Sequence, residues 1–376
     1  MYSVAVNASI LRAPRTGIGQ YLVELVGALA AHPEFELKLF NGWNWQSELP
    51  AAAMPGYSRL SSALKRIPGA YALRRVAEQR RFDRNASSIG LYHEPSLWPF
   101  EFDGPMVMTL HDLTHVHYPQ TQPADRLAAI HRYSERGVAQ AHRILVDSHF
   151  IAEEVRQHYG LAAERIVVAP LGHSARFRPR EAGDLAVGLT RLGLQPGGYL
   201  LCVGTLEPRK NLQLALRAHE RLPGTLRRQY PLVLAGMPGW RAEQLEKPLQ
   251  RALAGGQVRL LGYQDDLGLA ELFAGARLLL FPSLYEGFGL PVLEAMASGT
   301  PVIASNRASI PEVLGEAGVL IDPMDDVACA AAIEMLIEDQ DKWGALRTAG
   351  LLRAKTFTWQ QCAHITAGVY REAAKS

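Results

Sequence analysis

The sequence predicts an α/β protein built from two Rossmann-like domains, and three observations support this fold class. The chain has 376 residues, which suits two domains better than a single α/β core. Short apolar runs alternate with longer stretches of helical periodicity, as in the βαβ units that form parallel sheets. A segment rich in proline, glycine and charge, Gly172–Gly198, separates two series of this alternation and is typical of a linker.

The first series predicts strands at Val4–Ala8, Glu36–Phe40, Ile89–His93, Met106–Leu110, Ile144–Asp147 and Ile166–Ala169, and helices at Gln20–Ala31, Ala124–Ala141 and Phe150–Tyr159. The second predicts strands at Tyr199–Val203, Leu232–Ala235, Val258–Leu261, Leu278–Phe281, Val302–Ala304 and Val319–Ile321, and helices near 211–222, 241–254, 266–275, 291–298 and 325–338. Two further helical stretches follow, near Asp341–Ala354 and Thr358–Ala374.

These elements predict an N-terminal domain at 1–175, joined by a C-terminal helix at 356–376, and a C-terminal domain at 176–355. Open α/β sheets bind ligands beyond the carboxyl ends of their strands. Two such edges that face each other across a cleft would hold two substrates. This arrangement is the geometry of a transferase.

Composition excludes several classes of protein. A hydrophobic content of 48% and a charged content of 20% describe an ordered globular chain, and a net charge of +2 gives no reason to expect nucleic acid. Cys202, Cys329 and Cys362 form no CxxC pair, which fits free thiols in a reducing compartment. The sequence shows no signal-peptide pattern and no apolar run of ~18 residues, so we expect a cytoplasmic protein, free or on a membrane surface.

The stretch from Phe281 to Gly299 carries the clearest signal of a ligand site. A buried strand leads into a glycine loop, Gly287-Phe288-Gly289, and then into a helix that we expect to begin at Pro291. Glycines allow close approach of the backbone, and the free N–H groups of a helix start attract a phosphate. Glu286 and Glu294 flank this point and can accept hydrogen bonds from sugar hydroxyls. Acidic residues also favour a helix start through the dipole alone, but the strand–loop–helix context favours a ligand.

A second strand end carries adjacent cations, Arg209 and Lys210, in the segment Gly204-Thr-Leu-Glu-Pro-Arg-Lys-Asn-Leu212. Arginine can hold a diphosphate by bidentate contact and lysine can act as a point charge. Cations at a helix start oppose the dipole. Something anionic therefore has to compensate them.

Two features of the N-terminal half are weaker signals. Gly17 and Gly19 precede a helix, but Leu22 stands where a third glycine of the NAD fingerprint would fall, so we interpret them as a glycine loop near a ligand. His111 follows the strand at Met106–Leu110 and can bind a sugar or transfer a proton. A metal site built from His111, His115 and His117 lacks a compact carboxylate or cysteine set, and no Asp-x-Asp pair lies at a strand end.

Together these motifs resemble retaining glycosyltransferases of the GT-B fold, in the group 1 or family 4 class. The matching residues are the Glu286-x7-Glu294 element with its Gly-Phe-Gly-Leu-Pro loop, the Glu-Pro-Arg209-Lys210-Asn segment, Gly17-Ile-Gly19, His111-Asp112 and the segment that ends at Pro179. The resemblance spans nearly the whole chain and is loosest between about 41 and 105. Where the family often has Asn-Gly-Val-Asp in the linker, this chain has Leu-Gly-His-Ser.

The resemblance implies a role for each site residue. Glu286 would contact the donor sugar, Glu294 the ribose, and Arg209 and Lys210 the diphosphate, whose leaving charge they stabilise. His111 would bind the sugar from the other domain. The remaining implied donor contacts are the loop glycines and their neighbours, Gly17, Gly19, Gly287, Phe288, Gly289 and Leu290, and the base-binding pair Tyr263 and Gln264. No metal or cofactor is implied beyond the nucleotide sugar itself.

The resemblance is strongest to bacterial mannosyltransferases of O-antigen and exopolysaccharide assembly. It implies a GDP-activated hexose, mannose or a 6-deoxy relative such as rhamnose, and a glycan acceptor carried on polyprenyl diphosphate. The segment from Arg59 to Arg84 has eight cationic side chains against two anionic ones, with apolar residues at helical spacing. This pattern fits contact with an anionic membrane at the cytoplasmic face or with a polyprenyl-diphosphate acceptor, and it equally fits a solvated surface helix.

Five alternatives stay open at this point. A UDP-sugar-dependent transferase or a sugar-nucleotide epimerase of the same fold would carry the same motifs, and a phosphorylase would need inorganic phosphate or a pyridoxal lysine. A non-catalytic protein that binds nucleotide sugars would bind the donor without releasing the nucleotide. An NAD-dependent dehydrogenase is disfavoured by Leu22.

Overall fold

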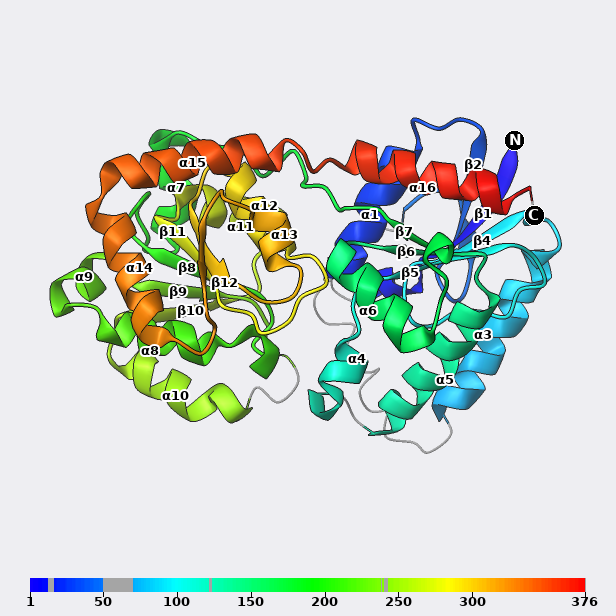
Figure 1. Ribbon diagram of the computed structural model, residues 1–376, viewed down its shortest axis with the longest axis horizontal. Coiled ribbons are helices and arrows are strands. Elements are labelled where there is room, and N and C mark those ends of the chain that lie inside the picture. Colours follow the sequence, from blue (N-terminus) through cyan, green and yellow to red (C-terminus); the bar gives the residue numbers. More distant parts are fainter. Residues whose placement is uncertain (13–16, 50–69, 122–123, 238, 240–242, 376) are drawn as a thin grey trace. The chain divides into compact units, whose positions relative to one another are not determined.

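The computed structural model describes residues 1–12, 17–49, 70–121, 124–237, 239 and 243–375 of the chain (Figure 1). The chain forms two compact units. Unit 1 comprises Met1–Leu113, Ala124–Leu171 and Trp359–Ser376, and unit 2 comprises Thr114–Pro123 and Gly172–Thr358. Residues 114–123, which we expected in the N-terminal domain, thus pack with the C-terminal one. The predicted linker at Gly172–Gly198 contains a helix, α7 (Ala182–Arg191), so this part of the prediction was wrong.

Unit 1 is built on a sheet with the strand order β3-β2-β1-β4-β5-β6-β7. All neighbouring pairs are parallel except β2 with β3. The strands are β1 (Tyr2–Asn7), β2 (Phe35–Phe40), β3 (Trp45–Gln46), β4 (Leu91–Glu94), β5 (Met106–Leu110), β6 (Arg143–Val146) and β7 (Ile166–Val168). Every residue of β4 and β5 is buried, which is why central parallel strands appear in sequence as continuous apolar runs.

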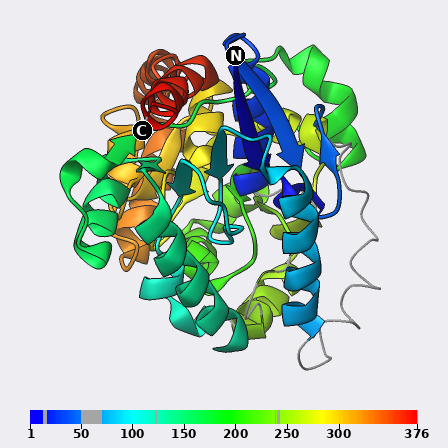
Figure 2. The same cartoon turned by 90° about the vertical axis from the view of Figure 1, so that its right-hand side faces the viewer.

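Helices cover both faces of this sheet. The C-terminal helix α16 (Trp359–Ala373) packs against α1 (Gly17–Leu29), which connects β1 to β2. The other connecting helices are α3 (Ala70–Ala86) before β4, α5 (Ala124–Gln140) between β5 and β6, and α6 (His149–Tyr159) between β6 and β7. Between β4 and β5 the chain crosses without a helix. This crossover lies between α3 and α5, which are light blue and teal in Figure 2.

Unit 2 has a wholly parallel sheet with the strand order β10-β9-β8-β11-β12-β13. Its strands are β8 (Leu200–Val203), β9 (Leu232–Ala235), β10 (Val258–Gly262), β11 (Leu278–Phe281), β12 (Val302–Ser305) and β13 (Val319–Ile321). Its helices are α4 (Thr114–His117), α7, α8 (Leu212–Arg221), α9 (Gly224–Gln229), α10 (Glu243–Ala254), α11 (Asp266–Gly275), α12 (Leu290–Ala297), α13 (Ile310–Leu314), α14 (Asp326–Glu338) and α15 (Gln340–Ala354).

The core of unit 2 follows from this alternation. Apolar residues of β8, β9 and β11 pack against one face of α8, and α14 closes the same layer through Ile333 and Leu336. All three cysteines are free and buried, as the absence of a CxxC pair predicted. Within the described part of the chain, no helix is long and apolar enough to cross a membrane.

The basic segment at 59–84 divides between described and undescribed residues. The apolar positions Leu60, Leu64 and Ile67 lie outside the described residues. In α3, Arg74 pairs with the buried Glu78 at 2.9 Å, and Arg12 reaches the same carboxylate at 2.9 Å. Arg12 therefore helps to hold α3 on unit 1, whereas the pair of Arg74 and Glu78 lies within the helix.

A close contact between two glycines fixes the spacing of β8 and β9 at their carboxyl ends. Gly236 has a φ of +152°, and a Cβ built there would lie 1.9 Å from the carbonyl oxygen of Gly204. We expect Gly236→Ala to destabilise the protein by roughly 2–4 kcal/mol, because backbone strain adds to overpacking against a backbone atom. Thermal unfolding measures this change. Gly344→Ala in α15 has nothing within 4 Å and is the matched control, expected to be neutral or slightly stabilising.

Candidate active site

The site in unit 2 forms where β8 and β11 end side by side. These strands pair in parallel, with Leu200 beside Leu278 and Leu201 beside Leu279, so their carboxyl-end loops leave the sheet next to each other. The first loop carries Arg209 and Lys210, and the second carries Glu286. Strand pairing thus brings together residues that are 76 or 77 positions apart in the sequence.

These three side chains form a compact ion-pair cluster. Arg209 Nη1 lies 2.8 Å from Glu286 Oε2, and Lys210 Nζ lies 2.7 Å from Glu286 Oε1. Arg209 Nη2 also contacts Glu207 Oε1 at 2.8 Å. The sequence predicted that an anion compensates the two cations, and in the structure the carboxylates of Glu286 and Glu207 do so. Glu207 lies in the same sequence segment as the two cations, but the sequence alone predicted no role for it.

Burial sets the electrostatics of the cluster. The side chains of Arg209 and Lys210 are each 12% exposed, and that of Glu286 is 10% exposed. Burial alone would raise the pKa of Glu286, but the positive charges of Arg209 and Lys210 outweigh it and lower this pKa to about 2. Glu286 is therefore ionised throughout the range in which the protein can work.

Backbone hydrogen bonds hold both loops in place. The amide of Leu284 donates to the carbonyl of Arg209 at 2.8 Å, and the Asn211 side chain donates to the carbonyl of Pro282 at 3.2 Å. Asn211 itself has a φ of 52°, the left-handed region. The buried Ser309 donates to the carbonyls of Glu286 and Phe288, at 2.9 and 3.0 Å. The carboxylate and its cations thus sit on a rigid support rather than on free loops.

The glycine loop leads into α12 much as predicted. The helix begins at Leu290, so Pro291 occupies its second position and not the first. Gly289 precedes the helix with a φ of +105°, and a Cβ there would lie 2.7 Å from Ile310 Cδ1, which is why glycine is required. No side chain caps the start of this helix. The amides of Val292 and Leu293 donate to the carbonyl of Gly289, and the predicted contact of this helix start with a phosphate stays a prediction.

The other predicted donor contacts lie along the same sheet. Glu294, in the second turn of α12, is 8% exposed, and Phe288 is buried edge-to-face against Phe357. Tyr263 and Gln264 follow β10, two strands from β8 and therefore about 10 Å along the sheet edge. Tyr263 is 46% exposed, which is unusual for a large aromatic ring and suits stacking on a planar group.

In unit 1, His111 follows β5 as predicted and pairs with Asp147, which follows β6. His111 Nδ1 lies 2.7 Å from Asp147 Oδ2. Gly17 and Gly19 do not form a loop: they belong to the first turn of α1. Their interpretation as a glycine loop was wrong, because the helix begins three residues earlier than its apolar periodicity indicates. The same helix carries Tyr21, which packs on His111 at 4.5 Å between ring centroids.

The neighbouring His117 has a packing role. The rings of His117 and Tyr118 lie tilted against that of Tyr285, with centroids 5.1 and 5.7 Å apart, and so support the loop that carries Glu286. Among the residues that the structure describes, no group of three or more His, Cys, Asp or Glu side chains is arranged to hold a metal ion. His111, His115 and His117 thus do not form such a group.

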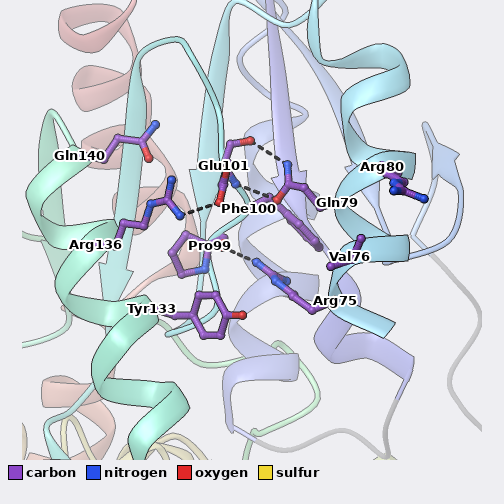
Figure 3. Close-up of a pocket in the computed structure, with 10 residues that line it drawn as sticks. All are labelled: Arg75, Val76, Gln79, Arg80, Pro99, Phe100, Glu101, Tyr133, Arg136 and Gln140. Carbon is purple, nitrogen blue, oxygen red and sulfur yellow. Dashed lines mark hydrogen bonds and ion pairs between the residues drawn. The ribbon is translucent and has the colours of Figure 1, made fainter. Parts of the chain in front are cut away.

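A pocket of about 270 Å³ lies elsewhere on unit 1, between α3, the β4–β5 crossover and α5 (Figure 3). Its polar groups largely satisfy one another. Gln79 exchanges hydrogen bonds with the backbone of Glu101, Arg136 pairs with the Glu101 carboxylate, and Arg75 donates to the carbonyl of Pro99 and lies 3.8 Å above the ring of Phe100. These contacts hold the crossover against its helices. We assign the pocket a structural role.

Comparison with known proteins agrees with this geometry. The sequence matches the family described as Glycosyltransferase Family 4 over residues 15–175 and that described as Glycosyl transferases group 1 over residues 195–351. Over 373 residues it is 37% identical to the O-antigen chain mannosyltransferase B of Escherichia coli, an alignment that covers 96% of this chain and 97% of that protein.

Solved structures share the fold. Sucrose-phosphate synthase from Thermosynechococcus elongatus aligns with a TM-score of 0.75 at 22% identity, over 99% of both chains. Anabaena HepE in complex with UDP and glucose aligns with a TM-score of 0.74 at 18% identity, over 99% of this chain and 100% of that one. The fold is therefore GT-B, with two Rossmann-like domains, as predicted.

These matches define the class of protein: the chain belongs to the group 1 glycosyltransferases. The predicted family and the prediction of an enzyme that transfers a hexose are confirmed by the family models and by the whole-length relative. Within the family, the chain resembles the O-antigen chain mannosyltransferase of Escherichia coli along nearly its entire length.

The Glu286 cluster predicts a pH-dependent contribution to stability. Its folded-state pKa of about 2 lies below the ordinary value of 4.5, so the stabilisation is fully present above about pH 4.5 and is lost as pH falls toward 2. The two values correspond to roughly 3 kcal/mol. We expect Glu286→Gln to be less stable than the parent at pH 6, with a gap that narrows at pH 3. Denaturant unfolding at both pH values measures this.

The exposed Glu316 provides the matched control, because Glu316→Gln removes a carboxylate from unit 2 without touching the cluster. This control should follow the parent at both pH values. If the difference in the free energy of unfolding between Glu286→Gln and the parent stays constant from pH 6 to pH 3, the lowered pKa of Glu286 is contradicted.

Proposed function

We propose that this enzyme transfers mannose from GDP-mannose to a glycan acceptor in bacterial O-antigen assembly, with retention of the anomeric configuration. The observation that carries this proposal is the cluster of Arg209 and Lys210 on Glu286. It places two nearly buried cations and a carboxylate at one strand edge, beside the start of α12, which no side chain caps. The identity of the sugar and the pathway rest on the name of the O-antigen mannosyltransferase relative.

The two cations have the properties needed to hold the diphosphate of a nucleotide sugar. Their side chains are nearly buried, so their fields are weakly screened, and Arg209 can offer a bidentate fork. Negative charge develops on the diphosphate as the bond to the sugar breaks. Preorganised cations stabilise this charge without a reorganisation cost, which is the main electrostatic contribution to such a reaction. We accordingly propose that no metal ion takes part in the transfer.

Glu286 is proposed to act on the donor sugar as an ionised carboxylate. Without ligand it neutralises Arg209 and Lys210, and an incoming diphosphate competes with it for both cations. The displaced or shared carboxylate can then accept hydrogen bonds from sugar hydroxyls and stabilise an oxocarbenium-like ion pair. The acceptor hydroxyl attacks the anomeric carbon on the face from which the diphosphate leaves and gives its proton to that diphosphate, which preserves the configuration. His111 of unit 1 is proposed to bind the same sugar.

For the nucleotide base of the donor, the proposed guanine has one specific alternative, uracil. Tyr263 is exposed and about 10 Å along the sheet edge from β8, which suits a base that stacks on its ring. HepE is solved with UDP, so a UDP-sugar-dependent enzyme of the same fold is the second candidate. For the acceptor, we propose a polyprenyl-diphosphate-linked glycan. The basic segment at 59–84 would bring the enzyme to the anionic membrane that carries it.

A donor panel tests this function. The purified enzyme is offered GDP-mannose, UDP-glucose and other nucleotide sugars with a lipid-linked glycan, in the presence of EDTA. We expect transfer from GDP-mannose and an α-linked product by NMR. GDP should stabilise the protein against heat by about 2.7 kcal/mol at a concentration of 100 Kd. Transfer from a UDP-sugar alone would favour the second candidate. GDP-mannose binding with no release of GDP would indicate a non-catalytic binding protein.

Variants in the cluster should separate binding from chemistry. Lys210→Met removes a diphosphate contact, so we expect GDP binding to weaken by about 10-fold or more. Glu286→Gln removes a competitor for the cations, so GDP binding should be unchanged or tighter while transfer falls about 100-fold or more. Isothermal titration with GDP and initial rates with GDP-mannose measure the two effects. Lys247→Met, on the exposed side of α10, is the charge-matched control. Parent-like transfer by Glu286→Gln would remove Glu286 from the mechanism.

A further inference from the structure

We propose that Asp147 is a positioning residue that acts through His111, fixing which ring nitrogen carries the contact to the substrate. The inference rests on the proposed function, because it assumes that His111 binds the donor sugar. Asp147 belongs to none of the motifs that carry the family resemblance. It is identified by its buried contact with the His111 ring.

Strand register places this pair together. β5 and β6 are neighbouring parallel strands, and Leu110 lies beside Val146 at their carboxyl ends. The next residue in each chain segment is His111 in one case and Asp147 in the other. Ser148 then caps α6 by accepting a hydrogen bond from the amide of Ile151 at 3.2 Å, which fixes the backbone beside Asp147. The resulting separation of Nδ1 and Oδ2 is 2.7 Å.

The ring of His111 is held from another side by a buried hydrogen-bonded chain. Tyr21 packs edge-on against it, with ring planes 77° apart. The Tyr21 hydroxyl lies 3.0 Å from Thr109 Oγ1, which in turn lies 2.8 Å from His93 Nε2. His93 Nδ1 then lies 2.7 Å from the hydroxyl of Tyr370 on the C-terminal helix. Rotation of the His111 ring would disturb both this packing and the bond to Asp147.

These contacts leave one ring atom for a ligand. His111 Nε2 is buried and makes no hydrogen bond of good geometry within the described residues, although the carbonyl of Pro95 lies close enough to favour the charged ring. A carboxylate can only accept, so Asp147 requires the proton on Nδ1. A neutral ring would therefore present a lone pair at Nε2, and a charged ring would present an N–H donor.

Charge decides between these two forms. Burial lowers the pKa of His111, but the charge and hydrogen bond of Asp147, the charge of Asp112 and the carbonyl of Pro95 together raise it above its ordinary value. The charged ring is thus favoured, and Nε2 donates to a hydroxyl oxygen of the sugar. The titratable groups that surround this ring or its Tyr21 neighbour are Asp147 beyond β6, Asp112 beyond β5, His93 on β4, Tyr21 on α1, and Cys362 and Tyr370 on α16.

Among these groups, Asp147 supplies the main charge that favours the imidazolium. Its side chain is only 4% exposed, so its field on His111 is weakly screened. The same burial raises the pKa of Asp147, and the charge and hydrogen bond of His111 act against this rise. His93 is held neutral by burial, which lowers its pKa to about 3. Asp112 contributes after Asp147. Removing the charge of Asp147 while keeping its shape should therefore return His111 to a neutral ring at working pH.

The test compares the parent with Asp147→Asn, which keeps the size of the side chain and a carbonyl acceptor for Nδ1. Asp103→Asn, at an exposed position of the same unit, is the matched control. The first readout is the NMR titration of the His111 ring, which needs no activity. We expect its pKa to fall by about one unit or more in Asp147→Asn, since an opposite charge at this distance shifts a pKa by about 1–3 units.

The second readout is the pH profile of kcat and of kcat/KM for GDP-mannose. If the imidazolium form binds the sugar, activity falls as pH rises through the pKa of His111, and Asp147→Asn moves this limb to lower pH. At pH 7.5 we expect a loss of about 10-fold or more that is recovered on acidification, with GDP binding unchanged. A merely structural role would lower activity at every pH.

The outcomes separate this inference from the function on which it rests. If the parent transfers no sugar from any donor, the proposed function fails, and the NMR titration still reports on the pair. If the parent is active but Asp147→Asn keeps its pH profile and its His111 pKa, the positioning role of Asp147 is wrong. A lowered His111 pKa with an unchanged profile overturns the link between this pair and the sugar.

Discussion

The candidate site depends on keeping a carboxylate ionised in a nearly closed environment. Transfer of Glu286 from water to a place where its side chain is 10% exposed is costly unless opposite charges lie within hydrogen-bond distance. Arg209 and Lys210 meet this requirement only because β8 and β11 are adjacent and parallel. The two loops, the hydrogen bond from Ser309 to the carbonyl of Glu286, and Gly289 before α12 keep the carboxylate of Glu286 within reach of both cations. Under the proposed function, an incoming diphosphate would compete with Glu286 for both cations.

Sequence reasoning recovered most of the fold because buried parallel strands and amphipathic helices each have a simple signature. β9, β11 and β13 were predicted residue for residue. α7 was missed because prolines and glycines surround it, although Leu185 and Leu189 carry its buried stripe. β3 has only two residues and pairs at an edge, so it has no periodicity to detect. The start of α1 was misplaced because glycines, which are poor helix formers, occupy its first turn.

The site shows a different limit. Residues at the carboxyl ends of strands were identified correctly as a group, because every parallel sheet exposes them at one edge. The residues that pair with them were not predicted, because such pairing depends on strand order and register. Asp147 was assigned to the end of a strand, and only the pairing of Leu110 with Val146 shows that it meets His111. Glu207 stood inside a recognised motif, yet only the fold of the turn at Pro208–Lys210 directs it back to Arg209.

The two units apply one electrostatic rule in opposite directions. In unit 2, two cations lower the pKa of a buried carboxylate and keep it negative. In unit 1, a buried carboxylate raises the pKa of a histidine and favours its charged form. Each group would lose its charge in the same environment without its partner, since burial alone favours the neutral form of both. Charge in this enzyme is therefore a property of pairs set by strand register. A substitution at one member is expected to act through the protonation or pairing of the other, as well as through its own lost contacts.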